Sequence, residues 1–312
     1  MRTINLNTKT GHWAILLVLA FIWGSSFILM KRGLESYSYT QVASLRLFIA
    51  FLFLIPFAFP HLKMMFGKKA FYIMSIGVIG NGIPAFLFTY AQKGLSSSLT
   101  GMLNSLTPLF TLLLGIFIFK TKIKWHNGLG VVIGLTGALG LIAANEGSSF
   151  NGSFHYASYI ILATVLYATS VNIIKKNLAE VSSVQIASLA LMFVGPFAGI
   201  YLFSTDFTTV LVSNPKALTS LGYIAILAIV GTALSIIVFN VLIKMTNAIF
   251  ASSVTYIIPV FAMLWGIFDD EIISLVQILW IGIILLGVYL VNAKKDIIKG
   301  IRLKKTALNL GD

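Results

Sequence analysis

Polar side chains interrupt several long apolar runs of this sequence at positions where they could bind a small solute. Trp23 precedes Gly-Ser-Ser in the first run. Arg46 lies about two helical turns into the second. An arginine at the centre of a membrane helix costs about 2.5–3.5 kcal/mol on insertion scales, so its position needs a reason. Arg46 is a candidate anchor for a carboxylate or a phosphate. The alternatives are snorkelling to the nearer interface and binding of backbone carbonyls that a helix break has freed.

Three prolines fall inside predicted membrane helices, each beside polar residues. Proline breaks the hydrogen-bond ladder of a helix and frees carbonyl oxygens, which within lipid must find partners or line a cavity. Helical spacing puts Asn104 and Pro108 on one face. Asn81 and Pro84 share a face in the same way. We expect Pro84, Pro108 and Pro259 to act as hinges beside an inward-facing polar stripe. For any single Ser or Thr on that stripe, a hydrogen bond between helices is the simpler explanation.

Two aromatic residues lie near the middle of predicted spans, away from the interfacial belts where Trp and Tyr usually lie. Trp23 and Tyr167 could stack on or hydrogen-bond a solute, or they could only pack against neighbouring helices. Asn172 follows Tyr167 on the same helix and would be costly to expose to lipid, so we expect it to face inward. The candidate substrate-binding residues are Trp23, Ser26, Arg46, Asn81, Gln92, Asn104, Tyr167, Asn172, Thr255 and Tyr256.

The composition predicts an all-α polytopic membrane protein. Of 312 residues, 58% are hydrophobic and 10% are charged, whereas about a quarter of the residues of a soluble domain are charged. A membrane-spanning helix needs about 20 predominantly apolar residues. The sequence predicts ten transmembrane helices, near residues 13–32, 38–59, 70–91, 96–119, 127–145, 155–175, 184–203, 217–243, 247–268 and 274–293.

The lysines and arginines gather in the loops on one side of these predicted spans. With both termini in the cytoplasm, most of the 22 Lys and Arg residues fall on the inner side, as the positive-inside rule requires. This placement explains the net charge of +13 without a nucleic-acid partner. Residues 1–12 then form a cytoplasmic N-terminus and residues 294–312 a basic cytoplasmic tail. The tail could lie on anionic lipid, although a topology signal explains it more simply.

The two halves of the chain resemble each other. An offset of 144 positions matches Ser26 to Ser170, Lys31 to Lys175 and Gln41 to Gln185. Later in each half, an offset of 151 matches Pro108 to Pro259 and Phe88 to Phe239. Chance similarity between apolar sequences is the alternative, but two ungapped blocks in the same order argue against it. Each half holds five predicted spans, an odd number, so residues 13–145 and 155–293 would form two five-helix inverted repeats.

The sequence lacks the motifs that several kinds of catalysis and cofactor binding require. The sequence contains neither a GxxxxGK[ST] phosphate loop nor an HExxH zinc motif, and it contains no cysteine. No two carboxylates lie in the middle of a predicted span, and no nucleophile lies beside a base. We therefore expect no enzyme, no cofactor and no metal site.

Six segments together resemble the drug/metabolite transporter superfamily, in its EamA-type branch. They read WGSSFILMK, SLRLFIA, SLTGMLNSLTPLFTLLLG, YATSVNIIKK, ASSVTYIIPVFAMLWGIFDDE and IGIILLGVYL. The resemblance spans residues 13–293. It implies ten helices around a central pocket, with the fifth helix of each unit outside, and export of small metabolites, often amino acids. The family usually has Glu after the fourth span of each unit. Here Glu271 keeps it in the second unit, while Lys120 replaces it in the first.

These observations favour a secondary transporter that moves a small polar metabolite, an amino acid or related compound, out across the bacterial cytoplasmic (inner) membrane by alternating access. A proton-coupled drug/metabolite exporter and a passive solute channel remain alternatives. The absence of a carboxylate in mid-span favours uncoupled transport. The expected partners are the small-molecule substrate and the lipid bilayer, around a monomer or a homodimer. Lys31 and Lys175 would anchor helix ends, or form gates with Glu35 or Glu180.

Overall fold

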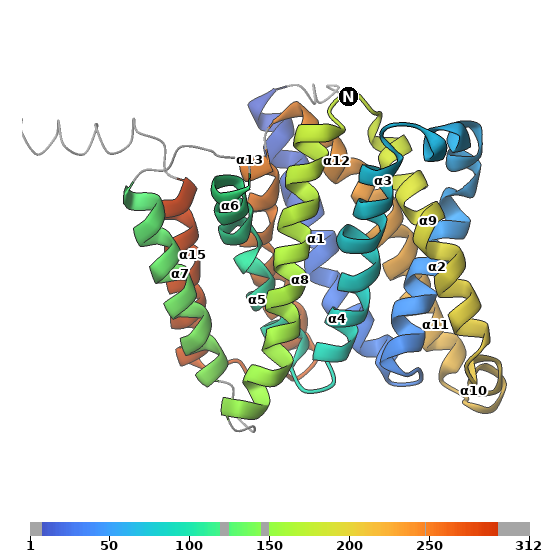
Figure 1. The fold of residues 1–312 in the computed structure, drawn as a ribbon. Helices are drawn as coiled ribbons and strands as arrows, with labels where there is room; N and C mark the ends of the chain where they lie inside the picture. The colour runs from blue at the N-terminus through green and yellow to red at the C-terminus, as the bar shows by residue number, and fades with distance from the viewer. Residues whose placement is uncertain (1–7, 119–124, 145–149, 247, 293–312) are drawn as a thin grey trace, which may run out of the picture.

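The computed structural model describes residues 8–118, 125–144, 150–246 and 248–292, and their regular structure is helical throughout (Figure 1). The expectation of an all-helical protein is therefore confirmed for these ranges. Lys120 and the basic tail of residues 294–312 lie outside the described residues, as do residues 1–7 of the predicted cytoplasmic N-terminus.

Short irregular helices (η) divide several of the long helices into segments. In the first half the elements are α1 (Lys9–Leu34), α2 (Tyr39–Ala58), η1 (Phe59–Phe66), α3 (Ala70–Gly77), η2 (Val78–Gly82), α4 (Ile83–Ala91), α5 (Ser97–Leu103), η3 (Asn104–Leu106), α6 (Thr107–Phe117) and α7 (Trp125–Ala143). In the second half they are α8 (Phe150–Asn177), α9 (Ser183–Phe203), α10 (Phe207–Ser213), α11 (Ala217–Ala228), η4 (Ile229–Leu234), α12 (Ser235–Met245), α13 (Ala248–Ser252), η5 (Ser253–Tyr256), α14 (Ile258–Phe268) and α15 (Leu275–Asn292).

Eight helical stretches of the described chain are long and apolar enough to cross a bilayer. They are Thr10–Leu34, Tyr39–Phe66, Ala70–Ala91, Ser97–Phe117, Gly152–Asn177, Ser183–Phe203, Ala217–Met245 and Phe250–Phe268. Two shorter apolar helices, Gly128–Ala143 and Leu275–Leu290, correspond to the fifth predicted span of each half.

Four of the long stretches contain a break in the α-helix. The segments η2 and η4 are π-helical, and η3 and η5 are 3₁₀-helical. Pro84, Pro108 and Pro259 each lie at the first turn of the α-helix that follows a break. Proline fits there because the N–H that it lacks would have no partner within the new helix. The prolines therefore begin helical segments, and their predicted hinge role stays a prediction.

Matched capping boxes explain part of the similarity between the halves. The Ser38 hydroxyl accepts a hydrogen bond from the Gln41 backbone N–H, while the Gln41 side chain accepts one from the Ser38 N–H. Ser182 and Gln185 repeat the arrangement at the start of α9. A capping box satisfies two of the donors that the start of a helix leaves free. Each half therefore begins its second long helix in the same way.

Ion pairs between the ends of helices define the two ends of the bundle. At the Glu271 end, the last turn of α1 meets the segment that follows α14, through Lys31 and Glu271. At the Lys69 end, the start of α3 meets the segment that follows α8, through Lys69 and Glu180. Helix α1 runs toward the Glu271 end and α8 runs away from it, so the two helices are antiparallel (Figure 1).

Glycines let α7 and α15 pack closely at one edge of the bundle, where Figure 1 shows them side by side. A Cβ atom on Gly287 would lie 2.4 Å from the backbone nitrogen of Gly134, and one on Gly140 would lie 2.3 Å from the Trp280 ring. The glycine-rich sequence of α7 thus serves packing within the chain.

Gly287→Ala should destabilise the protein because its methyl group would meet rigid backbone rather than a flexible side chain. Overpacking of this kind costs about 1–3 kcal/mol. Gly282→Ala on the same helix is the matched control, since a Cβ there meets nothing within 4 Å. The melting temperature of the detergent-purified protein should fall for Gly287→Ala and hold or rise for Gly282→Ala. Equal melting temperatures for the two variants would contradict this account of the α7–α15 contact.

Candidate functional site in a central cavity

A cavity near the middle of the bundle takes side chains from both halves of the chain. Its volume is about 130 Å³, well above the roughly 10–15 Å³ that one water molecule requires. Each of the four breaks η2, η3, η4 and η5 contributes to its wall. The lining residues are Trp23, Ser26, Phe27, Met30, Arg46, Leu47, Ile76, Gly80, Asn81, Phe88, Asn104, Thr107, Tyr167, Ser170, Val171, Ile174, Gly231, Thr232, Ile236, Phe239, Asn240, Ser252 and Thr255.

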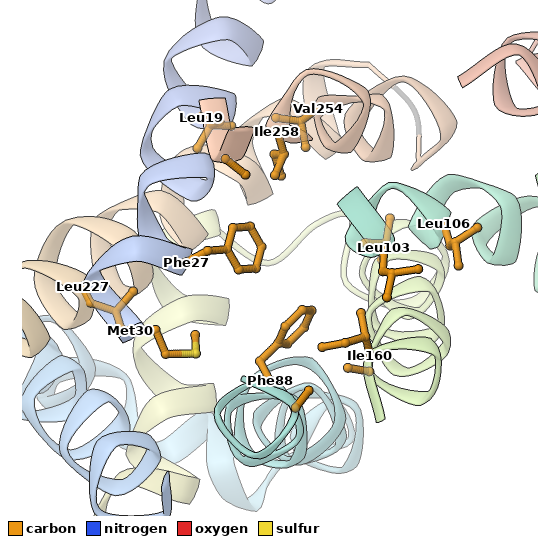
Figure 2. Close-up of a cluster of buried hydrophobic side chains, with 14 of the residues drawn as sticks. Leu19, Phe27, Met30, Phe88, Leu103, Leu106, Ile160, Leu227, Val254 and Ile258 are labelled. Atoms are coloured by element: carbon orange, nitrogen blue, oxygen red, sulfur yellow. The ribbon is translucent and has the colours of Figure 1, made fainter. Parts of the chain in front are cut away.

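Two aromatic pairs form corresponding parts of the wall. Trp23 meets Phe239 edge to face, with ring centroids 4.9 Å apart. Tyr167 stacks on Phe88 with centroids 5.7 Å apart. Under the two sequence offsets, Trp23 corresponds to Tyr167 and Phe88 to Phe239, so each pair joins one half of the chain to the other. Figure 2 shows Phe27 and Phe88 pointing toward each other.

A second pair of matched contacts brings α1 and α8 against the π-helical segments of the opposite halves. A Cβ atom on Gly231 would lie 2.8 Å from the Ser26 hydroxyl oxygen, and one on Gly80 would lie 2.4 Å from the Ser170 hydroxyl oxygen. The Trp23 indole N–H also donates to the Gly231 carbonyl at 3.1 Å. A side chain at either glycine would therefore require the facing serine to move.

Arg46 brings a positive charge to this wall. Its Nε donates to the Thr232 hydroxyl at 2.7 Å, and its guanidinium lies near the Tyr167 side chain. Within the part of the chain that the structure describes, no carboxylate pairs with Arg46, and no other lining residue carries a full charge at neutral pH. The site therefore offers an incoming anion a cation that no described carboxylate neutralises.

Two asparagines keep hydrogen-bonding capacity toward the cavity. The Asn81 amide donates to the Ile76 carbonyl at 3.1 Å, and no described residue donates to its side-chain oxygen. The Asn104 side-chain oxygen accepts a long bond of 3.4 Å from Thr107, and its amide donates to no described residue. The wall thus combines a cation, an acceptor and a donor with aromatic faces, which suits a small polar solute with an apolar part.

Seven of the ten candidate residues line the cavity: Trp23, Ser26, Arg46, Asn81, Asn104, Tyr167 and Thr255. Their role in binding stays a prediction. The other three donate to backbone carbonyls of other helices, so they hold the bundle together. These bonds run from Gln92 to Phe27 at 3.1 Å, from Asn172 to Thr111 at 3.1 Å and from Tyr256 to Val288 at 3.5 Å.

Some lining residues were absent from the candidate set. Asn240 is 1% exposed, and its side-chain oxygen is buried without a hydrogen bond. The sequence could have indicated Asn240, because it is the only amide side chain in the apolar run SIIVFNVLIK. Thr232 matches Asn81 under the 151 offset, and each donates to the carbonyl five residues before it. The repeat could therefore have identified Thr232 as a candidate lining residue, the counterpart of Asn81.

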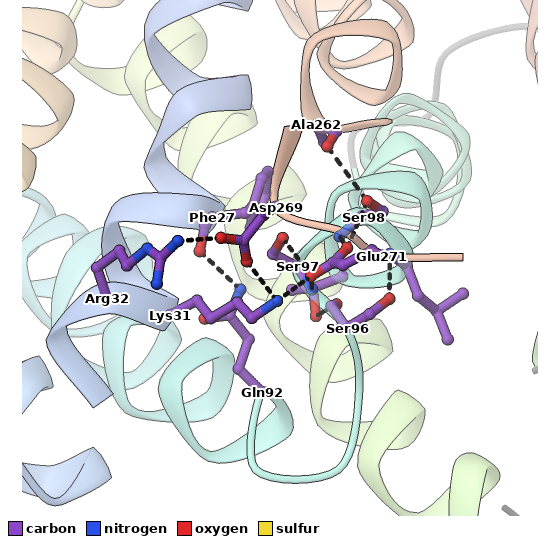
Figure 3. Close-up of polar contacts among 12 residues, drawn as sticks. Phe27, Lys31, Arg32, Gln92, Ser96, Ser97, Ser98, Ala262, Asp269 and Glu271 are labelled. Carbon is purple, nitrogen blue, oxygen red and sulfur yellow. Dashed lines mark hydrogen bonds and ion pairs between the residues drawn. The ribbon is translucent and has the colours of Figure 1, made fainter. Parts of the chain in front are cut away.

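A cluster of charged and hydroxyl side chains joins α1, α5 and the segment after α14 at the Glu271 end (Figure 3). The Lys31 ammonium lies 2.6 Å from Asp269 and 2.8 Å from Glu271. Glu271 also accepts hydrogen bonds from the backbone N–H and the hydroxyl of both Ser97 and Ser98, at 2.6–3.0 Å. Its carboxylate thereby caps the positive N-terminus of α5.

These contacts determine the ionisation of Glu271. Burial raises the pKa of its carboxyl group, but hydrogen bonds from Lys31, Ser98 and Ser97 outweigh the burial and lower the pKa to about 2. The carboxylate is therefore ionised throughout the neutral range.

Lys31 and Lys175 do not form the alternative gate pairs with Glu35 or Glu180 in this structure. Lys31 pairs with Asp269 and Glu271, and Arg32 pairs with Glu35 at 2.6 Å. At the Lys69 end, Lys175 donates to the carbonyls of Ile243 and Thr246 at 3.1 and 2.9 Å. Glu180 instead pairs with Lys69 through a side chain that is 87% exposed, where an ion pair contributes little.

The site contains no evident place for a metal ion. Over the described ranges, no three His, Cys, Asp or Glu residues lie close enough together to hold one. The chemistry of the cavity is that of hydrogen bonds, one cation and aromatic surfaces.

Several known proteins are similar to this chain, two of those below along nearly its whole length. An inner membrane transporter of Escherichia coli K12, YedA, whose function is uncharacterised, is 28% identical over 299 residues, covering 90% of each chain. An uncharacterised transporter of Archaeoglobus fulgidus is 25% identical and covers 91% of this chain and 99% of its own. A probable amino-acid metabolite efflux pump of Salmonella typhimurium is 28% identical over 168 residues, about half of each chain.

A protein of known crystal structure has the same fold, with a TM-score of 0.64 and 14% identity over 91% of this chain and 97% of its own. The model of the EamA-like transporter family matches twice, at residues 11–143 and 156–293. The two matches cover most of the sequence, and the division falls between the two halves that resemble each other. The chain therefore belongs to the EamA-like transporter family.

Proposed function

We propose that this protein is a secondary carrier that binds a small polar metabolite in the central cavity and exposes it to each side of the membrane in turn. In this proposal α7 and α15 also span the bilayer, which gives ten membrane helices in two inverted five-helix units. The observation that carries the proposal is the cavity, whose wall is built from matched residues of both halves.

The exchanged contacts support alternating access. Trp23 packs on Phe239, and Tyr167 packs on Phe88, so the same type of contact occurs on both sides of the cavity. Helices α1 and α8 are antiparallel (Figure 1). Two similar units of opposite direction can rock about a midplane site, because each closes the path that the other opens.

Arg46 supports a substrate with an anionic group, and an amino acid or a related compound is our preferred class. The carboxylate would bind the guanidinium, while the aromatic wall would contact the apolar part of the solute. Outward transport is preferred because the Salmonella relative is named as an amino-acid metabolite efflux pump.

The distribution of lysine and arginine supports an orientation with both termini in the cytoplasm of a bacterial cell. The Lys69 end would then face inward and the Glu271 end outward. The protein would work in the cytoplasmic membrane as a monomer or a homodimer.

The Glu271 cluster would close the outward path in this conformation. Its hydrogen bonds join α1 and α5 of the first unit to the segment after α14 of the second. Movement of one unit against the other would have to break them. The corresponding position of the first unit is Lys120, so the Lys69 end would lack an equivalent carboxylate, and the cluster would be one-sided.

Two rival mechanisms make different predictions. A passive channel would give flux without counterflow, and a proton-coupled exporter would accumulate solute across a pH gradient. The low pKa of Glu271 favours uncoupled transport, since this carboxylate would stay ionised on both sides of the membrane in this conformation. Counterflow of labelled amino acids in proteoliposomes, without an imposed gradient, tests the carrier. Flux without counterflow would refute the proposal.

Arg46→Ala should weaken the transport of substrates that carry a carboxylate by about 10- to 100-fold, as expected for the loss of a charge-assisted hydrogen bond. The corresponding carboxamides should lose much less. The measurement is competition against labelled substrate in proteoliposomes. Lys216→Ala is the matched control, because it removes an exposed cation far from the cavity. Equal losses for acids and amides would make Arg46 a structural residue.

Glu271→Gln should open the cavity toward the Glu271 end, because a neutral amide holds Lys31 and the α5 N-terminus less firmly. The chain has no cysteine, so Ser170→Cys in the cavity wall gives a single reporter. Its labelling by a membrane-impermeant thiol reagent, applied from that end, should speed up several-fold. Glu35→Gln, which removes an exposed carboxylate at the same end, is the control. Unchanged labelling of Glu271→Gln would mean that the cluster is not a gate.

The stability contributed by Glu271 should depend on pH in the acid range. Because its folded-state pKa of about 2 lies below the ordinary value of 4.5, ionised Glu271 stabilises the fold fully above about pH 4.5. The contribution declines as the pH falls from there toward 2. The melting temperatures of wild type and Glu271→Gln should therefore differ most at neutral pH and converge in acid. A difference that stays constant from pH 7 to pH 3 would contradict the assignment.

A further inference from the structure

The connector between α2 and α3 exposes aromatic rings at the Lys69 end. It comprises η1 and the residues up to the first turn of α3, and no residue of η1 is buried. Phe59, Phe66 and Phe71 are 70%, 93% and 75% exposed. Figure 1 shows the connector at the outer edge of the bundle, beyond α9. Rings so exposed at the end of a membrane helix can enter the boundary between headgroups and acyl chains.

The same connector carries lysines whose charges are poorly balanced. Lys63 and Lys68 are exposed. Lys69 lies close enough to Lys244 for their charges to repel each other. Among the described residues, Lys69 has one ion-pair partner, Glu180, while Lys63, Lys68 and Lys244 have none. An anion bound near Lys69 and Lys244 would relieve the repulsion between their ammonium groups.

The corresponding connector at the other end of the bundle is different. Between α9 and α11 it carries Asp206 and Lys216, whose charges cancel, and the side chain of Asp206 accepts a hydrogen bond from Gln41. Its Phe207 is buried. Exposed rings with unbalanced cations therefore occur in the α2–α3 connector and not in its counterpart.

We propose that residues 59–71, together with Lys244, bind the headgroup of an anionic phospholipid in the leaflet at the Lys69 end. The lysine ammonium groups hold the phosphate, and the exposed phenylalanines enter the acyl region beside it. The occupant is a lipid rather than a free anion because the cations and the apolar rings belong to one short segment. This site is separate from the central cavity and does not depend on the transport proposal.

The test is a lipid titration of the delipidated, detergent-purified protein, followed by native mass spectrometry. Phosphatidylglycerol and phosphatidylcholine with identical acyl chains are the probes. Wild type should bind phosphatidylglycerol more tightly. The double variant Lys63→Gln/Lys68→Gln should bind it at least about tenfold more weakly, because each lysine near the headgroup plane contributes to the attraction. Phe66→Ser should weaken the binding of phosphatidylglycerol several-fold.

The control is Lys93→Gln/Lys216→Gln, which removes the same charge from the Glu271 end. It should bind phosphatidylglycerol as wild type does. The melting temperatures of wild type and the two double variants in lipid-free detergent should agree. Equal losses in the two double variants would reduce the effect to net charge and overturn the proposal. Unchanged affinity in Phe66→Ser would overturn it as well. Displacement of the lipid by an equimolar amount of inorganic phosphate would assign the cations to a free anion instead.

Discussion

Within a bilayer every backbone N–H and C=O must find a hydrogen-bond partner, because no water is present to supply one. In the long helical stretches of this protein the regular α-helical ladder breaks at η2, η3, η4 and η5, and all four breaks contribute to the wall of the central cavity. There the released groups meet side chains and cavity space rather than lipid. The Asn81 and Thr232 side chains bond to carbonyls five residues before them, so polar lining residues also repair the breaks. The cavity and the broken helices are therefore one feature.

Around that cavity the shape is nearly symmetric and the charge is not. Ser26 faces Gly231 as Ser170 faces Gly80, so the two halves approach each other through the same type of contact. Arg46 has no such counterpart, since the 144 offset places Ala190 opposite it. In the proposed mechanism, similar packing on the two sides would permit two alternative arrangements of the units. If the cavity binds a solute as proposed, its single charge would give an anionic solute one preferred orientation.

The sequence predicted much of the cavity lining. The candidate residues that do not line the cavity have a common cause. Trp23, Arg46 and Tyr167, three of the candidate residues, line the cavity. Gln92 and Asn172 also turn inward but donate to carbonyls of neighbouring helices. Helical periodicity places a residue on the inner face of its own helix. It does not say which backbone groups of the facing helices lack a partner, and those groups decide whether an amide donates to another helix or keeps its hydrogen-bonding capacity toward the cavity.

The sequence alone determined the helical membrane character, the similarity of the halves and the family, because these depend on local apolar length and on the order of residues along one chain. Only the tertiary structure decided which carboxylate Lys31 meets, since Asp269 and Glu271 come from a segment far away in the sequence. It also decided that Thr232 contacts Arg46 and that the glycines of α7 pack against α15. Such pairings depend on how helices cross, and a crossing is determined by both surfaces at once rather than by either sequence segment.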